Sequence, residues 1–492
     1  MSTNKKIKSL KLNAVLNVIK SLMGIVFPLI TFPYVTRILH VEYLGRVNYA
    51  QSLVSYFSLI AGLGISTYAM REGAKVRNKR ESFQRFCNEI FTINLLTTAV
   101  AYGLLFILLF CVQQLAQYRQ LIILISLSII FTTIGIDWVN SIYEDYVVIA
   151  ARSVIIQIVN LCLLFAFVKS ENDYYIYAFL TVFPQMAICV CNFFYCRKYC
   201  NIRVIKQSNI KKHIKPMLTL FANNIAVTLY CNADLTMIGW MLSDYYVGIY
   251  SVAVKVYTII RSLLASIFIV CIPRLSSFVG TSQKDKFRNL VNDITCVLII
   301  LALPAVTGLW LLAEPIVRVL AGADYTNSIM TLKILSLAIP FSVFGGVITN
   351  CINVPMTKES INLKATVIAA VTNIGLNIIM IPVFQQNGAA LTTVLAEFTV
   401  IVVCFIGDVR LKKIFAWTSV LTTLFQSLAG CVGVGLVCFV LQQFIESTLY
   451  CCFASIMGSI VIYSIILILE RNKYMVLAIG KAMQALRSNK KT

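Results

Sequence analysis

The stretch Leu39–Ala50, LHVEYLGRVNYA, returns in closely similar form 203 residues later as Leu242–Ala253, LSDYYVGIYSVA. Leu, Tyr, Gly and Ala recur at matching places in the two copies, and each copy ends one long apolar segment and begins the next. Weak internal symmetry between two apolar halves is typical of secondary transporters, whose substrate site lies between the repeats near the middle of the membrane. The stretch therefore predicts two related halves. The alternative is that two tight helix turns converged on Tyr and Gly.

Composition places the chain in a membrane. Of its 492 residues, 59% are hydrophobic and 13% are charged, whereas soluble proteins average about 45–50% apolar and about 25% charged residues. We predict an all-α polytopic membrane protein. A net charge of +22 would suggest nucleic acid as the partner of a soluble protein, but here the positions of the basic residues relative to the membrane matter more.

Apolar segments of roughly 20 residues are long enough to cross about 30 Å of hydrocarbon. We expect about fourteen: 12–36, 47–70, 87–112, 120–143, 147–168, 174–196, 216–241, 247–271, 290–312, 329–353, 361–383, 388–409, 418–441 and 449–469. They predict two six-helix lobes, 1–196 and 216–409, related by a pseudo-two-fold axis along the membrane normal. A basic linker, 197–215, joins the lobes. Two more helices in 410–470 and a basic amphipathic tail, 471–492, complete the chain.

The basic residues orient these segments. In the predicted topology 33 of the 42 Lys and Arg residues lie in loops and termini on one side of the membrane. Lys and Arg concentrate on the cytoplasmic side, so both termini are expected in the cytoplasm. No A-x-A cleavage site follows the first segment, which we expect to remain as a helix. Pro28 and Pro33 predict a kink or break within it.

Several kinds of chemistry are not expected. The 16 cysteines lie mostly inside apolar segments and are read as small hydrophobic residues. The chain has two histidines, His40 and His213, both expected at the interface, and no C-x-x-C, so we predict neither a disulfide framework nor a metal site. It has no phosphate-cradling glycine loop for a nucleotide. Transport would then be driven by an ion gradient, the membrane potential or the substrate's own gradient.

Charges inside the predicted spans are functional candidates, because each costs at least about 2.5–3.5 kcal/mol to insert. The carboxylates are Glu397, roughly 13 Å deep at a rise of about 1.5 Å per residue, Asp234 and Asp137. The cations are Lys20, Lys255, Arg261 and Lys333. The alternative for each charge is a structural ion pair, for example between Asp234 and a cation of the eighth span, or snorkelling of Lys333 to the interface.

Excess positive charge in a central cavity favours a phosphate-bearing substrate, because Lys and Arg offer charge-assisted hydrogen bonds to phosphate oxygens. A buried carboxylate nearby could carry a proton or bind a sodium ion. The sequence alone leaves these two roles open, and no other cofactor is expected.

Four motifs resemble the Wzx-type polysaccharide flippases of the multidrug/oligosaccharidyl-lipid/polysaccharide exporter superfamily, along nearly the whole chain. They are GIDWVNSIYEDYVVIAAR (Gly135–Arg152), YLGRVNYAQS from Tyr43, YVGIYSVAVKVY (Tyr246–Tyr257) and LNIIMIPVFQQNGAALTTVLAE (Leu376–Glu397). The resemblance implies two lobes around an alternating-access cavity. It also implies transfer of an undecaprenyl-pyrophosphate-linked oligosaccharide from the inner to the outer leaflet of the bacterial cytoplasmic membrane. The further partners that it implies are membrane lipids and other polysaccharide assembly proteins.

The resemblance also implies roles for single residues. Lys20, Lys255, Arg261 and Lys333 would bind the pyrophosphate or glycan, while Glu397, Asp234 and Asp137 would serve in ion coupling or gating. The expected structural positions are Gly45, Gly248, Arg152, Pro382 and Gly388. One departure is clear: where the family usually has an aromatic residue and a glycine before Gly-Ala-Ala, this chain has Phe384–Asn387, FQQN.

Three alternatives stay open. A peptidoglycan-precursor flippase would handle the same lipid pyrophosphate. A cation or drug antiporter should have an acidic or apolar cavity and usually stops at twelve spans. A membrane glycan polymerase, the enzymatic alternative, would need acid and base groups in a sizeable outer loop. The longest outer loop expected here is Ala313–Ser328, so we predict that the protein is not an enzyme.

Overall fold

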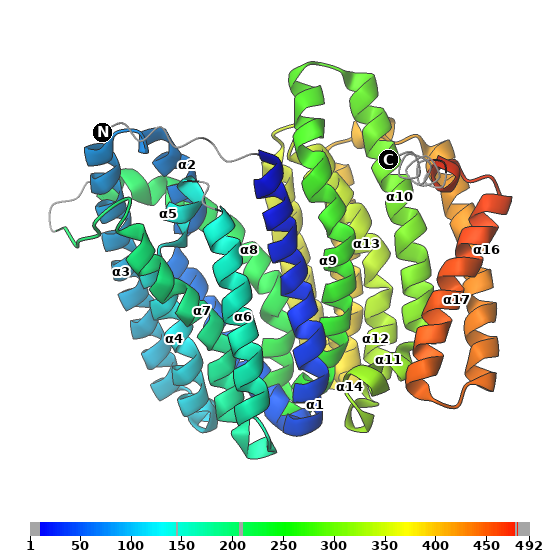
Figure 1. The fold of residues 1–492 in the computed structure, drawn as a ribbon, viewed down its shortest axis with the longest axis horizontal. Coiled ribbons are helices and arrows are strands. Elements are labelled where there is room, and N and C mark those ends of the chain that lie inside the picture. The colour runs from blue at the N-terminus through cyan, green and yellow to red at the C-terminus, as the bar shows by residue number, and fades with distance from the viewer. Residues whose placement is uncertain (1–9, 144–145, 206–209, 478–479, 481–492) are drawn as a thin grey trace, which may run out of the picture. The chain divides into compact units, whose positions relative to one another are not determined.

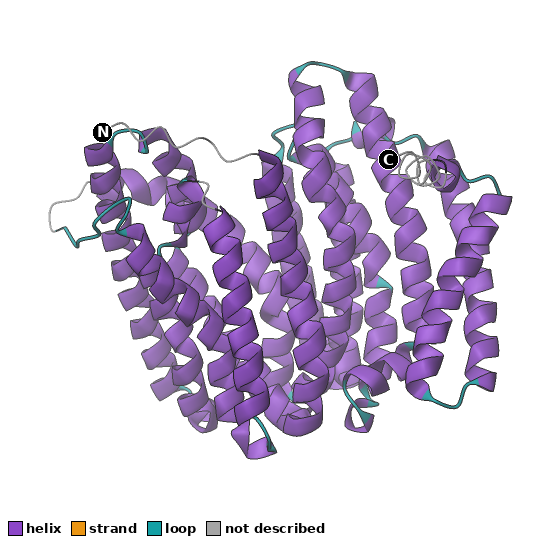
Figure 2. Cartoon of the chain, viewed as in Figure 1, coloured by secondary structure: helices purple, strands orange, loops and turns teal. Residues whose placement is uncertain are grey.

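The computed structural model describes residues 10–143, 146–205, 210–477 and 480 (Figure 1). Throughout this part of the chain the regular structure is helical, and no strand occurs (Figure 2). The predicted all-α class is therefore confirmed. The chain forms two compact units, Met1–Gly248 and Ile249–Thr492, called unit 1 and unit 2 below. The division into lobes at 197–215 stays a prediction.

The described residues of unit 1 form eight α-helices, short connecting turns and the start of a ninth helix. In chain order its helices are α1 (Leu10–Gly62), α2 (Ile65–Val76), α3 (Arg80–Cys111), α4 (Arg119–Gly135), α5 (Asp137–Ile142), α6 (Tyr146–Phe167), α7 (Tyr174–Cys196) and α8 (Ile210–Met241). Two 3-10 turns, η1 (Gln113–Tyr118) and η2 (Glu171–Asp173), precede α4 and α7. The ninth helix, α9 (Asp244–Gly280), continues into unit 2.

In unit 2, the part of the chain that the structure describes forms the rest of α9 and eight further α-helices. They are α10 (Lys284–Leu311), α11 (Ala313–Leu320), α12 (Ser328–Ser336), α13 (Ala338–Gly346), α14 (Glu359–Gly407), α15 (Leu411–Ile414), α16 (Trp417–Phe444) and α17 (Thr448–Leu469). A 3-10 turn, η3 (Ala323–Tyr325), precedes α12, and a π-helical segment, η4 (Val347–Asn353), follows α13.

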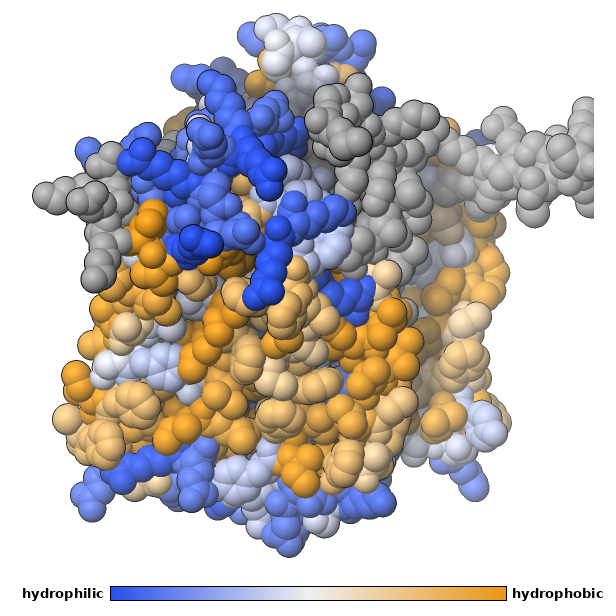
Figure 3. All heavy atoms as spheres, turned by 60° about the vertical axis from the view of Figure 1, so that its left-hand side comes forward, coloured by the Kyte–Doolittle hydropathy of each residue, from blue (hydrophilic) through white to orange (hydrophobic). Residues whose placement is uncertain are grey.

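Eleven helical stretches of the described residues are long and apolar enough to cross a membrane. Helices are expected there, because every backbone polar group inside a bilayer must find its hydrogen bond within the segment. On the face shown in Figure 3, apolar side chains occupy the middle, and hydrophilic side chains gather above and below them. The protein is therefore a multi-pass membrane protein. The number of fourteen crossings stays a prediction.

The helix α1 is 53 residues long and changes direction at one residue. His40 has φ 55° and ψ 179°, outside the helical range, while Pro28 and Pro33 lie inside regular helix. No break occurs at the two prolines, and a kink there stays a prediction. The helical geometry is lost at His40, between the predicted spans 12–36 and 47–70. At about 1.5 Å per residue, 53 residues exceed by far the roughly 20 that a bilayer needs, so α1 contains two segments of spanning length.

The helix α14 doubles back on itself. Its one non-helical residue is Gln385, with φ 54° and ψ −137°, three residues after Pro382. A Cβ atom added to Gly388 would lie 2.3 Å from the carbonyl oxygen of Met380. Residues eight apart in a straight helix are about 12 Å apart, so the two halves of α14 form a tight hairpin. The glycine allows the backbones to approach this closely.

Buried polar side chains join the two halves of this hairpin. The Thr392 hydroxyl donates to the amide oxygen of Asn377 at 2.5 Å, and the Asn377 amide donates to Asn373 at 3.2 Å. All three side chains are buried. Because unpaired polar groups are costly in an apolar interior, these bonds stabilise the register of the two halves.

Two predicted spans end elsewhere than the apolar pattern suggested. The predicted span 120–143 is divided, because α4 ends at Gly135 and Ile136 takes a left-handed conformation before α5. Gly135 packs so closely on Cys189 that an added Cβ would lie 2.4 Å from its sulfur. The predicted span 47–70 is interrupted between α1 and α2, where Leu63 and Gly64 both have positive φ. Hydropathy alone does not register these local breaks.

The two C-terminal helices pack on α10. The Tyr463 hydroxyl of α17 donates to the carbonyl of Ile300 on α10 at 2.9 Å. Tyr463 belongs to the apolar cluster that joins α16 and α17. After α17, Met475 packs against the same cluster, and the Tyr474 hydroxyl donates to Asp293. Burial, together with the neighbouring Asp293 carboxylate, raises the pKa of the Tyr474 phenol. Most of the predicted amphipathic tail, residues 478–479 and 481–492, lies outside the described residues.

Candidate functional site

The second half of α14 carries a buried carboxylate on the side that meets α9. Glu397 is 4% exposed, its Oε1 lies 3.7 Å from Nη2 of Arg261, and it accepts a 3.2 Å hydrogen bond from the Tyr257 hydroxyl. Tyr257 and Arg261 are four residues apart and so share one face of α9. One turn before Glu397, the hydroxyls of Thr393 and Tyr250 lie 3.3 Å apart. The two helices thus meet along a polar line, here called the α9–α14 seam.

The ion pair in this seam is asymmetric. The Glu397 side chain is 6% exposed, whereas the Arg261 side chain is 40% exposed. At 3.7 Å the two groups attract each other as charges, but this distance is longer than that of a hydrogen bond. A carboxylate buried in a membrane segment needs such a counter-charge. An anion arriving from the exposed side of Arg261 would compete with Glu397 for the guanidinium.

Two lysines of unit 2 differ from the Arg261–Glu397 pair because their ammonium groups have no partner among the described residues. Lys255 lies on α9, six residues before Arg261, and is half-buried; Lys333 lies on α12 and is also half-buried. Neither ammonium group has a hydrogen bond or ion pair with any residue that the structure describes. An ammonium group that is withdrawn from water without a partner is costly. Among the predicted site residues of unit 2, the three cations Lys255, Arg261 and Lys333 therefore outnumber the one carboxylate, Glu397.

The other predicted site residues lie in unit 1. Asp234 is buried on α8, two residues before Thr236, whose hydroxyl bonds to Ser52 of α1 at 2.9 Å. Asp137 is exposed, as the first residue of α5, so its coupling or gating role has no burial to support it. Lys20 belongs to α1, and its side chain lies outside the described residues. Of the predicted residues, the structure therefore brings Arg261 and Glu397 into direct contact.

The two copies of the repeated stretch pack against each other through their glycines. A Cβ atom on Gly45 would lie 1.9 Å from the carbonyl oxygen of Asp244, and one on Gly248 would lie 2.1 Å from the carbonyl oxygen of Val41. No side chain fits at either position. The predicted structural role of Gly45 and Gly248 thus has a physical basis, since the backbones of α1 and α9 touch at these two glycines.

Another buried carboxylate, which was not predicted from the sequence, lies beside these glycines. Asp244 is 9% exposed; it accepts a 2.7 Å hydrogen bond from the Tyr118 hydroxyl and a 3.0 Å bond from Nε of Arg46. Tyr49 packs edge-on against Tyr118. Asp244 begins α9, where a negative charge is favoured by the helix dipole. Its place in the repeat, one turn before Gly248, was the signal that could have identified it.

Arg152, predicted as a structural position, connects three helices of unit 1. Its Nη1 bonds to the side-chain oxygen of Asn192 on α7, which also accepts a 2.7 Å bond from Asn140 of α5. Asn192 is fully buried. Arg152 itself lies on α6, so the arginine and the two asparagines hold α5, α6 and α7 together.

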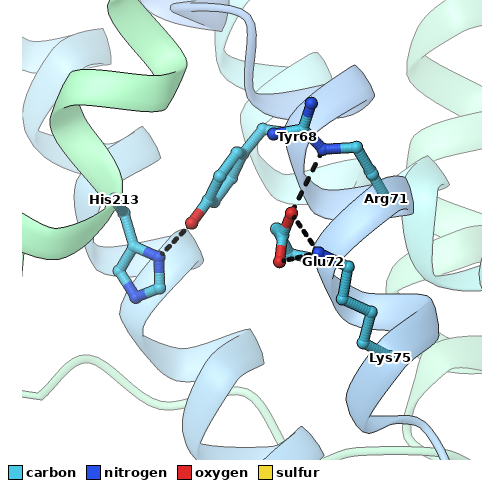
Figure 4. A network of polar contacts seen from close by, with 5 residues as sticks. All are labelled: Tyr68, Arg71, Glu72, Lys75 and His213. Carbon is cyan, nitrogen blue, oxygen red and sulfur yellow. Dashed lines mark hydrogen bonds and ion pairs between the residues drawn. The ribbon is translucent and has the colours of Figure 1, made fainter.

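Histidine 213 is buried, whereas His40 is exposed. The Nδ1 of His213 lies 2.7 Å from the Tyr68 hydroxyl, and its Nε2 lies 3.0 Å from Oε2 of Glu89. Figure 4 shows Tyr68 pointing at His213, while Glu72 on the same helix pairs with Lys75 and Arg71. His213 is thus a buried residue with two polar partners, and its interfacial position stays a prediction. Its partners come from α2 and α3, too far along the chain for a sequence pattern to connect them.

Comparisons with known proteins agree with this architecture. A family model described as polysaccharide biosynthesis protein matches residues 10–279, and a second model, MatE, matches residues 220–382. Together the two matches cover both copies of the repeated stretch.

Two curated relatives match over most of their own length. A protein named putative O-antigen transporter from Shigella dysenteriae is 22% identical over 350 residues, which are 71% of this chain and 87% of the relative. The capsular polysaccharide biosynthesis protein CapF from Staphylococcus aureus is 23% identical over 370 residues, 73% of this chain and 89% of the relative.

A solved structure shares the fold. The lipid II flippase MurJ in its inward closed conformation aligns with a TM-score of 0.74, covering 94% of this chain and 100% of that structure. The sequence identity is 16%, so this likeness concerns the fold.

Proposed function

The chain belongs to the family of polysaccharide biosynthesis proteins, and from this premise we propose that it is a flippase for a lipid-linked oligosaccharide. The proposed substrate is an oligosaccharide repeat unit joined to undecaprenyl pyrophosphate, which moves from the inner to the outer leaflet of the bacterial cytoplasmic membrane. The names of the relatives, an O-antigen transporter and a capsular polysaccharide protein, support this class of substrate. They also favour a transporter over an enzyme.

The main support for the proposal is the half-buried ammonium group of Lys255, which is unpaired within the described part of the chain. Its ammonium group is half-buried on a long apolar helix and has no partner among the described residues. A charge kept in such a place at a cost is a functional candidate by default. Pyrophosphate would supply the missing counter-charge through charge-assisted hydrogen bonds. We assign Lys255 to the pyrophosphate, with Arg261, Lys333 and Lys20 as further cationic groups.

The α9–α14 seam suggests how binding is coupled to an ion. While Glu397 is ionised, it pairs with Arg261 and accepts the Tyr257 hydrogen bond. When an anionic head group draws Arg261 away, Glu397 loses its counter-charge, and uptake of a proton or a sodium ion then becomes more favourable. Because such coupling is reciprocal, binding of the cation at Glu397 also favours binding of the anion at Arg261. Asp234 and Asp137 remain further candidates for coupling or gating.

Unit 2 also offers a surface for the lipid. A cavity of about 340 Å³ lies between α10, α13, α14 and α16, and its lining includes Leu298, Phe341, Phe398 and Val420. Phe398 directly follows Glu397, so the cavity adjoins the face of α14 next to the seam. An apolar cavity excludes charged groups but accepts hydrocarbon through van der Waals packing. We assign it to part of the prenyl chain.

We also propose an orientation in the membrane and a set of partners for the protein. Because 33 of the 42 basic residues lie on one side of the predicted topology, we expect both termini in the cytoplasm. The partners are then membrane lipids, the lipid-linked oligosaccharide and, in the cell, other polysaccharide assembly proteins. A peptidoglycan-precursor flippase is the second candidate, supported by the fold shared with the lipid II flippase. Both candidates predict recognition of a prenyl pyrophosphate.

Reconstitution of the purified protein into liposomes tests the proposal. Undecaprenyl-pyrophosphate-linked oligosaccharide is placed in both leaflets, and a membrane-impermeant glycosidase removes the sugar that it can reach. Without transport, about half of the glycan stays protected; with an active flippase the protected fraction falls toward zero. A protected fraction that stays at about half, with protein confirmed in the vesicles, would contradict the proposal. Lipid II offered in the same assay separates the two candidates.

A further inference from the structure

Unit 1 contains a cavity of a different character from that of unit 2. It has a volume of about 490 Å³ and lies between the second half of α1 and the helices α4, α7 and α8. This volume falls within the range of about 300–1,000 Å³ found for small-molecule sites. Its polar lining consists of uncharged amides and hydroxyls, among them Gln51, Ser58, Thr181, Gln185, Thr228 and Asn232. None of the described residues that line it carries a charge.

Much of this polar lining has hydrogen-bonding capacity to spare. The hydroxyls of Ser58 and Thr228 make no hydrogen bond with any residue in the described part of the chain. Gln51 uses its amide nitrogen to bond Thr181 at 2.8 Å, and Asn232 uses its amide nitrogen to bond a backbone carbonyl at 3.1 Å. The amide oxygens of both residues are left as acceptors. The cavity therefore offers both donors and acceptors to a guest.

The uncharged polar lining suits one of the three parts of the proposed substrate, the pyrophosphate, the prenyl chain and the glycan, better than the other two. Pyrophosphate requires cationic partners, and no lining residue is cationic. A prenyl chain would leave the amides and hydroxyls unsatisfied, at a free-energy cost. A neutral sugar presents hydroxyl groups that both donate and accept hydrogen bonds, as the lining does. Of the three parts, the glycan fits this cavity best.

We propose that the cavity of unit 1 is a glycan subsite that binds neutral sugar rings through uncharged hydrogen bonds. This assignment rests on the proposed function, because it deepens the substrate class.

Equilibrium binding to the purified protein tests the assignment without requiring transport. Two probe lipids are compared by native mass spectrometry: undecaprenyl pyrophosphate bearing a neutral oligosaccharide, and undecaprenyl pyrophosphate without sugar. We expect the wild-type protein to bind the first lipid more tightly. In Thr228→Val, which removes a hydroxyl that has no partner in the described protein, affinity for the glycan lipid should fall about three- to tenfold. Affinity for the sugar-free lipid should not change.

A matched control and a second variant complete the test. Thr422→Val makes the same change at an exposed threonine of α16, whose hydroxyl bonds only within its own helix, and should leave both affinities unchanged. Gln185→Leu removes a lining amide and should act as Thr228→Val does. Unchanged binding of the sugar-free lipid by the variants also shows that they are folded.

Three outcomes would overturn the assignment. One is equal affinity of the wild-type protein for the two lipids. Another is an equal loss of affinity for both lipids in the variants, and a third is no loss for either lipid. If the wild-type protein binds neither lipid, the proposed function itself fails, and the glycan subsite falls with it.

Discussion

Glu397 and Lys255 illustrate two ways to hold a charge inside an apolar helix. Glu397 is almost fully buried and is compensated by Arg261 and Tyr257. Lys255 is half-buried and has no compensating partner among the described residues. A compensated charge can serve stability alone, whereas an uncompensated one reduces it. Different experimental signatures are therefore expected for the two residues.

The substitution Glu397→Gln keeps the size of the side chain and its ability to accept from Tyr257, but removes the charge that pairs with Arg261. We expect the protein to insert and to remain folded, while initial transport falls at least about tenfold, because one lost charge interaction of about 1.4 kcal/mol corresponds to that factor. Transport by the proteoliposome assay measures the effect. Glu314→Gln, in the exposed pair of Glu314 and Arg318, is the matched control and should transport normally. Normal transport by Glu397→Gln would remove this carboxylate from the mechanism.

The substitution Lys255→Met separates function from structure. If Lys255 serves the pyrophosphate, its removal should weaken binding of the lipid about tenfold to a hundredfold, the range for hydrogen bonds to charged groups. The melting temperature should not fall, since no protein partner is lost. Lys364→Met, at an exposed lysine of α14, provides the control. A large fall in melting temperature with unchanged lipid binding would show instead that Lys255 is structural.

For single residues, candidates could be identified from the sequence, but their partners could not. The apolar run around Glu397 was sufficient to predict its burial, because few charges occur in such a run. Its partner Tyr257 lies 140 residues away, and no local pattern connects them. Asp244 was missed, and the partners of His213 were not predicted, for the same reason: Tyr118 and Glu89 come from other helices. A side chain's local environment depends on packing that spacing does not encode.

At the scale of elements, glycines decide where the helices touch and turn. Gly45 and Gly248 let α1 and α9 approach until backbone meets backbone, and Gly388 allows the hairpin of α14. The repeated stretch predicted that the first two would matter. It did not predict that the two copies pack against each other.

The substitution Gly45→Ala tests this packing. The new methyl group would lie 1.9 Å from the carbonyl oxygen of Asp244, so the helices must separate, and we expect a loss of about 2 kcal/mol in stability, as for other overpacked sites. Gly103→Ala, in α3 with no heavy atom within 4 Å, is the matched control and should be neutral or slightly stabilising. Thermal unfolding in detergent measures both. Similar melting temperatures for the two variants would show that the α1–α9 contact is looser than described.

The turn of α14 gives the second test at this scale. Gln385 has φ 54° and ψ −137°, a region that glycine adopts readily and that strains other residues by about 1–3 kcal/mol. The family resemblance leads us to expect a glycine close to this turn. We predict that Gln385→Gly raises the stability by up to about 1 kcal/mol, while Gln385→Val lowers it because a β-branched residue resists positive φ. The same thermal unfolding assay decides, and a lower melting temperature for Gln385→Gly would count against the hairpin geometry.

The whole molecule was the most predictable level. Apolar segments of spanning length and the asymmetry of Lys and Arg predicted a multi-pass helical protein, because the bilayer restricts the possible structures so strongly. Hydropathy failed where single residues interrupt a helix. It separated the spans 12–36 and 47–70, between which His40 lies, but it did not detect the end of α4 at Gly135 or the interruption at Leu63 and Gly64.

Epitope tags can test the predicted topology. A short epitope tag inserted at Glu446, between α16 and α17, should be accessible to an antibody in spheroplasts, whereas a tag at Ser282, between α9 and α10, should be accessible only after permeabilisation. Tags at both termini should behave like the tag at Ser282, since an even number of crossings returns the chain to the same side. Opposite accessibility of the two termini would require an odd number and would contradict the expected fourteen.

The central claim is that the protein carries a lipid-linked glycan across the membrane. Its most direct test is the leaflet location of that glycan in cells with and without the protein, measured with a membrane-impermeant probe that reaches only outward-facing sugar. Without the protein, we expect the glycan to accumulate on the cytoplasmic side, shielded from the probe. Glycan that still reaches the outer face at the normal rate, in cells lacking any redundant flippase, would contradict it.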